Sequence, residues 1–266
     1  MNSTGPHSKI NLNVKYYIKI ILISISAFLY FPSYSMPVMA PEDLSYMTEH
    51  MPPFTFKENG KITGFSMKLL RLVWKQMGVE PQSVWMLPWA RAYIKLKNEE
   101  NAVLFTISRS AHREHFFKWV CPITFGSRHV FLAKKERKIK ISSLEDSKKY
   151  VIGTVIDDVV EQTLIQNGFK ESELHRVSSL IQNVQKLKQN RIDLIAQSEA
   201  SINGVIIEYG FDPNLYESVY LIMQVQSCFA FNPAVPDTLI NKFQSALDQV
   251  RLSDEFLKMK EEFKLH

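Results

Sequence analysis

Short apolar runs alternate with amphipathic segments along most of the chain. Runs of strand length lie at residues 44–47, 84–86, 102–105, 130–133, 150–155, 174–177, 192–196, 219–224 and 228–231. Helical periodicity separates many of them. At 65–77, for example, Met67, Leu70, Trp74 and Met77 fall at i, i+3, i+7 and i+10, on one face of a helix. This alternation predicts an α/β fold with mixed, mostly parallel sheets.

The order of the elements divides the chain into two lobes. Residues 36–125 form one series of strands and helices, and residues 126–224 form a second. The helices near the carboxyl end have no sheet of their own, so we expect residues 225–266 to return to the first lobe. Two crossing segments, near residues 123–128 and 222–227, would then act as a two-segment hinge.

The amino-terminal segment has the pattern of a secretory signal peptide. Residues 1–35 hold three lysines and no acidic residue, an apolar run at 20–31, and small residues at Ser33 and Ser35. The apolar run is shorter than the roughly 20 residues that span a bilayer. We therefore expect cleavage after residue 35 and export to the periplasm of a Gram-negative type of cell.

Removal of this leader changes the overall charge. Taking 35 residues from 266 leaves 231, and losing three lysines lowers the net charge from +5 to +2. The mature chain has no basic stripe with interleaved aromatics, so nucleic acid is not an expected partner. Cys121 and Cys228 lie in a compartment that permits disulfides. The sequence leaves open whether they form a bridge or remain two buried thiols.

Candidate chemistry is densest in the turn after the run at 102–105. Its polar side chains are Thr106, Ser108, Arg109, Ser110 and Arg113. In open α/β sheets, ligands bind at the carboxyl ends of the strands. A guanidinium flanked by hydroxyls can hold a carboxylate in a bidentate fork. The alternative is a surface turn with solvated arginines.

Further candidates lie at the same expected edge of the sheet. Pro52 and Pro53 stiffen a loop that carries Glu49 and Phe54, either beside a cleft or with Phe54 packed into the core. Another strand leads to Trp89 at the start of a helix that also carries Arg91. An aromatic ring there can stack on a ligand or hold a cation, or it can be part of the core.

Five motifs, in this order and spacing, resemble a known family. They are Met51-Pro-Pro-Phe54, Gly60-x-x-x-Gly64-Phe65, Pro88-Trp-Ala-Arg-Ala-Tyr93, Ser108-Arg-Ser-Ala-His-Arg-Glu114 and Phe117-Lys-Trp-Val-Cys-Pro122. The chain from about residue 44 to 263 is similar to the extracellular solute-binding proteins of family 3, the periplasmic receptors of polar amino-acid ABC transporters. The resemblance implies a two-lobed periplasmic-binding-protein-like fold of type II that closes on a small ligand.

The resemblance also assigns roles to residues of the first lobe. The carboxylate-binding arginine of the family corresponds to Arg113, and its hydroxyl partner corresponds to Ser108. The loop at 51–54 corresponds to an aromatic clamp. Trp89 is characteristic of the branch that this sequence resembles most, and Arg109 is an additional basic residue of that branch.

The second lobe departs from the family pattern. Ile156-Asp157-Asp158 stands where a Gly-Thr turn is common, and Ser198 stands where an aspartate usually meets the ligand's α-amino group. The nearest acid is Glu199. Carboxylates there would favour an ammonium or another cationic group, although Asp157 and Asp158 can also be explained as helix-capping residues.

The leading hypothesis is a monomeric periplasmic receptor that delivers a small zwitterion, an amino acid or a derivative, to an ABC permease. Neither a cofactor nor a metal is expected. One alternative is a dehydratase or lyase that uses Glu49, His50 or Glu199 as acid or base. The other is a sensory module, which would need a separate kinase or cyclase because no such domain precedes His266.

Overall fold

The structure is a computed structural model that describes Met1 and residues 39–263. Apart from Met1, the predicted signal peptide lies outside the described residues. Met39 to the carboxyl end groups as one compact unit. Among the described residues, no helix combines the length and the apolar character needed to cross a membrane.

The first half of the chain alternates strands and helices as its pattern predicts, and it also contains a two-stranded hairpin at residues 56–63. In order they are β1 (Ser45–Thr48), β2 (Phe56–Glu58), β3 (Lys61–Thr63), α2 (Phe65–Met77), β4 (Val84–Met86), α3 (Trp89–Asn98), β5 (Ala102–Ser108) and β6 (Lys118–Lys134). Strand β5 is longer than the apolar run at 102–105 predicted, so Thr106 and Ser108 belong to the strand rather than to the turn that follows.

The second half continues the alternation of strands and helices. Its elements are β7 (Ile152–Val155), α4 (Val159–Gln166), β8 (Leu174–Val177), α5 (Leu180–Lys188), β9 (Leu194–Ser198), α6 (Glu199–Glu208), β10 (Tyr216–Phe231), α7 (Asp237–Arg251) and α8 (Asp254–Glu262). We call residues 39–125 with 225–263 the first lobe and residues 126–224 the second lobe. This division follows the prediction from the sequence and stays a prediction.

Two long strands connect the lobes. Strands β6 and β10 pair antiparallel along nearly their whole length, and the strand order is β4-β1-β5-β10-β6-β9-β7-β8. The pairs β1–β4, β1–β5, β7–β8 and β7–β9 are parallel, so the sheet is mixed. The sequence predicted shorter strands along this path, at residues 130–133, 219–224 and 228–231. Strands β6 and β10 are instead continuous, because shifts of register in their pairing form bulges that accommodate Pro122 and Gly126.

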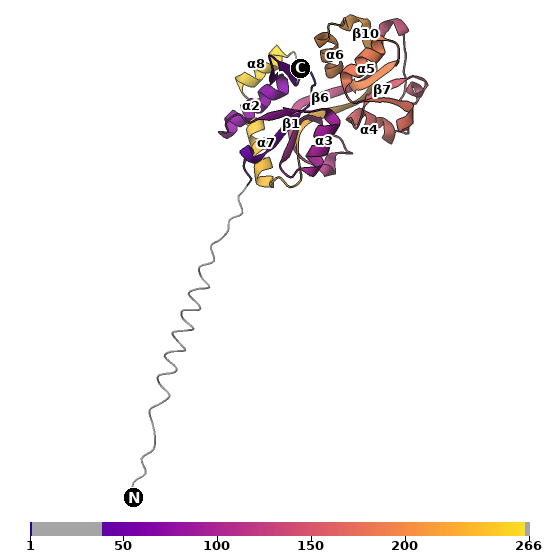
Figure 1. Cartoon of the computed structure of the whole chain (residues 1–266). Coiled ribbons are helices and arrows are strands. Elements are labelled where there is room, and N and C mark those ends of the chain that lie inside the picture. Colours follow the sequence, from indigo (N-terminus) through magenta and orange to yellow (C-terminus); the bar gives the residue numbers. More distant parts are fainter. Residues whose placement is uncertain (2–38, 264–266) are drawn as a thin grey trace. The chain divides into compact units, whose positions relative to one another are not determined.

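The buried apolar side chains form several clusters. Helices α2, α7 and α8 pack on the first-lobe part of the sheet around Tyr46, Trp74 and Phe243, whereas α4, α5 and α6 cover the second-lobe part (Figure 1). A further cluster around Trp89 and Tyr93 of α3 includes Val155 and Val177 of the second lobe. Apolar contact therefore joins the two lobes beside the carboxyl ends of β5 and β7.

Candidate functional site

Arg113 lies at the centre of the candidate site. It follows β5 in a turn closed by a hydrogen bond from its amide to the Ser110 carbonyl, and its side chain is 1% exposed. Its Nε donates to Oε1 of Gln162 at 3.0 Å, and its two Nη atoms donate to the carbonyls of Asp157, at 3.0 Å, and Ser108, at 3.4 Å. Burial lowers the pKa of Arg113. A guanidinium nevertheless stays protonated in proteins, so this is a buried positive charge.

Helix α3 supplies an aromatic face for this charge. Pro88 precedes its first residue, Trp89, and the rings of Trp89 and Tyr93 are stacked 5.3 Å apart. The Arg113 guanidinium lies over both rings, 5.0 Å from each centroid. This arrangement fixes the plane of the guanidinium and stabilises its charge away from water.

Glu49 approaches the same region from a rigid loop. Amides of Phe65 and Ser66, at the start of α2, donate to the carbonyls of Pro53 and Phe54 at 3.1 and 2.9 Å. Gly64 has φ of 104°, and a Cβ there would lie 2.4 Å from the Phe54 carbonyl oxygen, so this close approach requires glycine. The side chain of Phe54 is thereby held beside the cleft, although it is 5% exposed and also belongs to the core.

The Glu49 carboxyl has an altered ionisation. Burial, the neighbouring charge of Asp158 and an opposing effect of Arg113 together raise the pKa of Glu49 to about 8. Two carboxylates that face each other across the lobes repel, and a positive group between them would relieve that repulsion.

The second lobe presents its contacts through the turn before α4. Asp158 is the N-cap residue, and its Oδ1 accepts from the Val160 amide at 2.9 Å, which confirms the capping interpretation for this residue. Asp158 also lines the cavity at Arg113. The preceding residue, Asp157, has a positive φ of 60°, and its carbonyl accepts from both Arg113 and Gln162.

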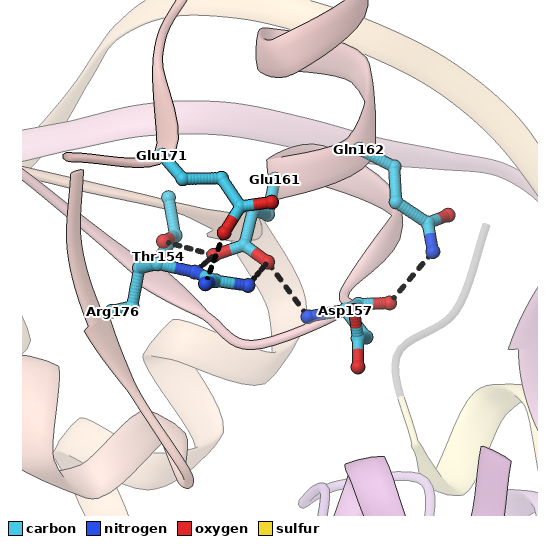
Figure 2. Close-up of polar contacts among 6 residues, drawn as sticks. All are labelled: Thr154, Asp157, Glu161, Gln162, Glu171 and Arg176. Carbon is cyan, nitrogen blue, oxygen red and sulfur yellow. Dashed lines mark hydrogen bonds and ion pairs between the residues drawn. The ribbon is translucent and has the colours of Figure 1, made fainter. Parts of the chain in front are cut away.

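A buried carboxylate holds this turn in place. Glu161 is 1% exposed, and its oxygens accept from the Asp157 amide at 2.7 Å and from Thr154 Oγ1 at 2.9 Å (Figure 2). Arg176 adds a bidentate pair to the same carboxylate, at 2.8 and 3.0 Å, and also contacts Glu171. Thr154 and Arg176 hold the carboxylate of Glu161, and this carboxylate holds the Asp157 amide. Glu161 therefore fixes the orientation of the turn and of the Asp157 carbonyl.

A histidine completes the polar lining. Nδ1 of His129 lies 3.2 Å from the Ser127 carbonyl, and its Nε2 lies 3.3 Å from Ser108 Oγ. Burial lowers the pKa of His129, which favours the neutral ring. Because the Ser127 carbonyl can only accept, Nδ1 donates to it, and Nε2 accepts a hydrogen bond from the Ser108 hydroxyl. This pair again joins a first-lobe residue to a second-lobe residue.

These side chains enclose a cavity of about 20 Å³ next to Arg113, which we call the anchor cavity. Its lining residues are Glu49, Met51, Phe54, Trp89, Thr106, Ser108, Arg113, Ser127, His129, Asp158, Gln197, Ser198 and Ser227. Three of its buried polar atoms, Trp89 Nε1, Thr106 Oγ1 and Ser227 Oγ, have no hydrogen-bond partner among the described residues. Buried polar groups are normally paired, so these atoms are suited to a polar ligand.

Other contacts join the loop at 51–54 and its neighbour His50 to α6. His50 Nε2 lies 2.7 Å from Glu208 Oε2 at the end of α6. A Cβ on Gly204 of the same helix would lie 2.2 Å from the Pro52 carbonyl oxygen, so α6 approaches the loop at 51–54 closely. The loop at 51–54 and α6 are therefore in direct contact as well.

Comparison with known proteins gives the family. Residues 45–266 match the bacterial extracellular solute-binding proteins, family 3. The chain belongs to this family. It is a solute-binding protein rather than an enzyme, and its fold is the periplasmic-binding-protein-like fold expected from the sequence.

Individual relatives agree with this assignment. The chain is 24% identical over 224 residues to the probable amino-acid-binding protein YxeM of Bacillus subtilis (strain 168), with 79% of each chain covered. A histidine kinase sensor domain with similarity to periplasmic binding proteins has a TM-score of 0.73 at 18% identity, covering 82% of this chain and 95% of its own. An ancestral arginine-binding protein bound to arginine gives 0.71 at 21%, covering 83% and 97%.

The predicted site residues of this solute-binding protein divide into two groups. Arg113, Ser108, Trp89, Phe54, Glu49 and Asp158 converge on the anchor cavity. Three predicted residues lie elsewhere. Arg109 is partly exposed and paired with Glu114, Arg91 lies on the exposed side of α3, and Glu199 pairs with Arg128 beside a neighbouring cavity.

Sequence reasoning named Thr106 only as one of the hydroxyls near the turn and did not select it as a ligand residue, although it is the only residue of β5 with a positive φ. Two further residues of the site were missed. His129 and Gln162 are single polar residues at the start of an apolar run and on a helix, where such residues are commonplace. Their partners, Ser108 and Arg113, come from the other lobe.

The cysteine alternatives are decided by the structure. Cys121 and Cys228 form a disulfide between β6 and β10. It lies next to the crossing segments, and an Nη of Arg109 contacts Cys121 Sγ at 3.7 Å. The bond ties together two strands that are 107 positions apart in the sequence.

Proposed function

We propose that this solute-binding protein captures a small zwitterion, an amino acid or a derivative, between its lobes in the periplasm and delivers it to an ABC permease. The observation that carries the proposal is the buried Arg113 guanidinium, which faces a cavity lined by unpaired polar atoms and two carboxyl groups. A solute with both charges complements that lining.

Arg113 is suited to bind the solute carboxylate. Of the five N–H donors of a guanidinium, three are used by Gln162, Asp157 and Ser108, which leaves one on each Nη atom. Two parallel N–H groups can accept a carboxylate in a bidentate arrangement. The unpaired Oγ1 of Thr106 provides a further contact in the same cavity.

Glu49 and Asp158 are suited to bind the solute ammonium. They face the cavity from different lobes and repel each other when both are ionised. An ammonium between them attracts both carboxylates. It can contact both only when the lobes are together. Trp89 and Phe54 would enclose the hydrocarbon part of the solute.

Closure of the lobes would be the signal that the permease recognises. We infer that the lobes divide at 125/126 and 224/225 and rotate about β6 and β10, which are the two strands that cross between them. A solute that completes contacts to both lobes selects the closed form. The names of the relatives, an amino-acid-binding protein and an arginine-binding protein, support an amino acid as the solute.

The test is a thermal-shift screen of the mature protein against amino acids, amines and small carboxylates. A solute that binds only the folded protein raises its melting temperature. We expect a rise with at least one zwitterionic amino acid or derivative and none with the matching amine or carboxylate alone. No shift with any compound would contradict the proposal.

A further inference from the structure

A second cavity, of about 240 Å³, adjoins the anchor cavity on the side of the crossing strands. We call it the hinge cavity. Its lining residues are Phe54, Phe65, Ile123, Thr124, Gly126, Ser127, Arg128, Ser198, Glu199, Ala200, Arg251, Phe256 and Lys260. Phe54, Ser127 and Ser198 line both cavities, so the two spaces meet at these three residues.

The volumes indicate where the bulk of a solute lies. The anchor cavity, at about 20 Å³, has room for about one water-sized group, so it can hold only part of the charged head of an amino acid. The hinge cavity is more than ten times larger. A solute whose carboxylate contacts Arg113 would therefore extend past Phe54 into the hinge cavity.

Part of the wall of the hinge cavity is apolar. Phe54, Phe65 and Phe256 are buried, at 5%, 1% and 5% exposure, and come from the loop at 51–54 and from helices α2 and α8. Ile123 and Ala200 add aliphatic surface from β6 and α6. An aliphatic chain can follow this path without leaving a buried polar group unpaired.

The charged groups of the hinge cavity are mainly positive. Arg128, Arg251 and Lys260 line it together with a single carboxylate, Glu199. Arg128 forms an ion pair with Glu199, with 2.8 Å between Nε and Oε2, and the Ser218 hydroxyl also donates to this carboxylate. Lys260 forms no ion pair with any residue in the described part of the chain, although it is half-buried.

We propose that the solute carries a second anionic group, a carboxylate at the end of an aliphatic chain, that occupies the hinge cavity. This inference rests on the proposed function, because it assumes that Arg113 binds the first carboxylate. Arg128 and Glu199 offset each other, so Lys260 leaves this part of the lining with a positive charge that attracts an anion and repels an ammonium. The solute class is then an amino acid with an acidic side chain several carbons long.

The proposal is tested by isothermal titration of the mature protein with three solutes of similar length, 2-aminoadipate, norleucine and lysine. They share the zwitterionic head and differ in the end of the side chain. We expect 2-aminoadipate to bind at least about tenfold more tightly than norleucine, and lysine to bind most weakly. Lysine or norleucine binding as tightly as 2-aminoadipate overturns the inference while the receptor function stands.

Absence of binding by all three solutes also overturns the inference, and the amino-acid screen then decides separately whether the receptor function holds.

A variant tests whether Lys260 contacts the second anionic group. Lys260→Met keeps an unbranched side chain and removes the charge, and should weaken 2-aminoadipate binding by about tenfold. Norleucine binding should not change. The control is Lys258→Met, an exposed residue of α8 outside the cavity. Equal weakening of both solutes, or of neither, contradicts the assigned contact.

Discussion

The side chain of Arg113 donates a hydrogen bond to Gln162 of the opposite lobe, with 3.0 Å between Nε and Oε1. The same glutamine donates through Nε2 to the Asp157 carbonyl, which also accepts from Arg113. Three groups therefore form a closed ring of hydrogen bonds across the cleft. The residue that is suited to bind the solute carboxylate is oriented by the lobe that closes over it.

This ring predicts the effect of changing Gln162. Gln162→Ala removes one charge-assisted hydrogen bond that exists only when the lobes meet, so solute affinity should fall by about tenfold. The measurement is isothermal titration with whichever amino acid gives the largest thermal shift. Gln166→Ala, an exposed glutamine of the same helix, is the matched control and should bind like the unchanged protein. Equal affinities for all three proteins would contradict the role of the ring.

Glu161 should matter for stability far more than its exposed neighbour. Glu161→Ala leaves Arg176, Thr154 and the Asp157 amide without their shared acceptor, and should lower the free energy of unfolding by about 3 kcal/mol. Glu171→Ala removes a second, exposed partner of Arg176 and should cost less than about 1 kcal/mol. Urea denaturation compares the two variants. Similar losses would show that the buried carboxylate does not organise this turn.

The disulfide gives a prediction about the crossing strands. Replacing both Cys121 and Cys228 by serine should lower the free energy of unfolding by about 3 kcal/mol, because the bond closes a long loop in the unfolded chain. A reductant should lower the melting temperature of the unchanged protein and leave that of the double variant unaffected. A melting temperature that does not respond to reductant would contradict the bond.

The raised pKa of Glu49 makes stability depend on pH. The pKa is about 8 in the folded protein and 4.5 for an ordinary glutamate, so the folded state holds a proton that the unfolded state releases between these values. The stability contributed by Glu49 is complete below pH 4.5, falls as the pH rises, and is lost above pH 8. Glu49→Gln should therefore melt several degrees above the unchanged protein at pH 8 and at nearly the same temperature at pH 4.5.

Melting curves at intervals from pH 4.5 to 9 provide the measurement. Glu58→Gln, an exposed residue of β2, is the control and should follow the unchanged protein at every pH. A Glu49→Gln curve parallel to that of the unchanged protein would contradict the buried, protonated carboxyl.

Sequence patterns predicted the features of this protein that depend on residues close together in the chain. The stripe from Met67 to Trp74 predicts α2, and the apolar run before Ser108 places Arg113 at the ligand edge of the sheet. The continuity of β6 and β10 was not predicted, because Pro122 and Gly126 interrupt the apolar pattern. Bulges in the long-range pairing of the two strands accommodate both residues.

The residues that the sequence missed depend on contacts between the lobes. Gln162 looks like any helix glutamine, and its partner Arg113 lies 49 positions away. Arg91 and Arg109 have side chains suited to binding a carboxylate, but neither lines the anchor cavity. Arg91 is on the exposed side of its helix, and Arg109 pairs with Glu114 five residues further on. Residue type alone could not separate them from Arg113.

The central claim is that Arg113 binds the solute carboxylate, and equilibrium titration of Arg113→Lys tests it most directly. Lysine keeps the charge and loses the planar fork, so affinity for the solute found in the thermal-shift screen should fall by about a hundredfold. Arg109→Lys, in the same turn but paired with Glu114, should bind within about twofold of the unchanged protein. Unchanged affinity of the Arg113 variant, or an equal loss in both variants, would contradict the assignment.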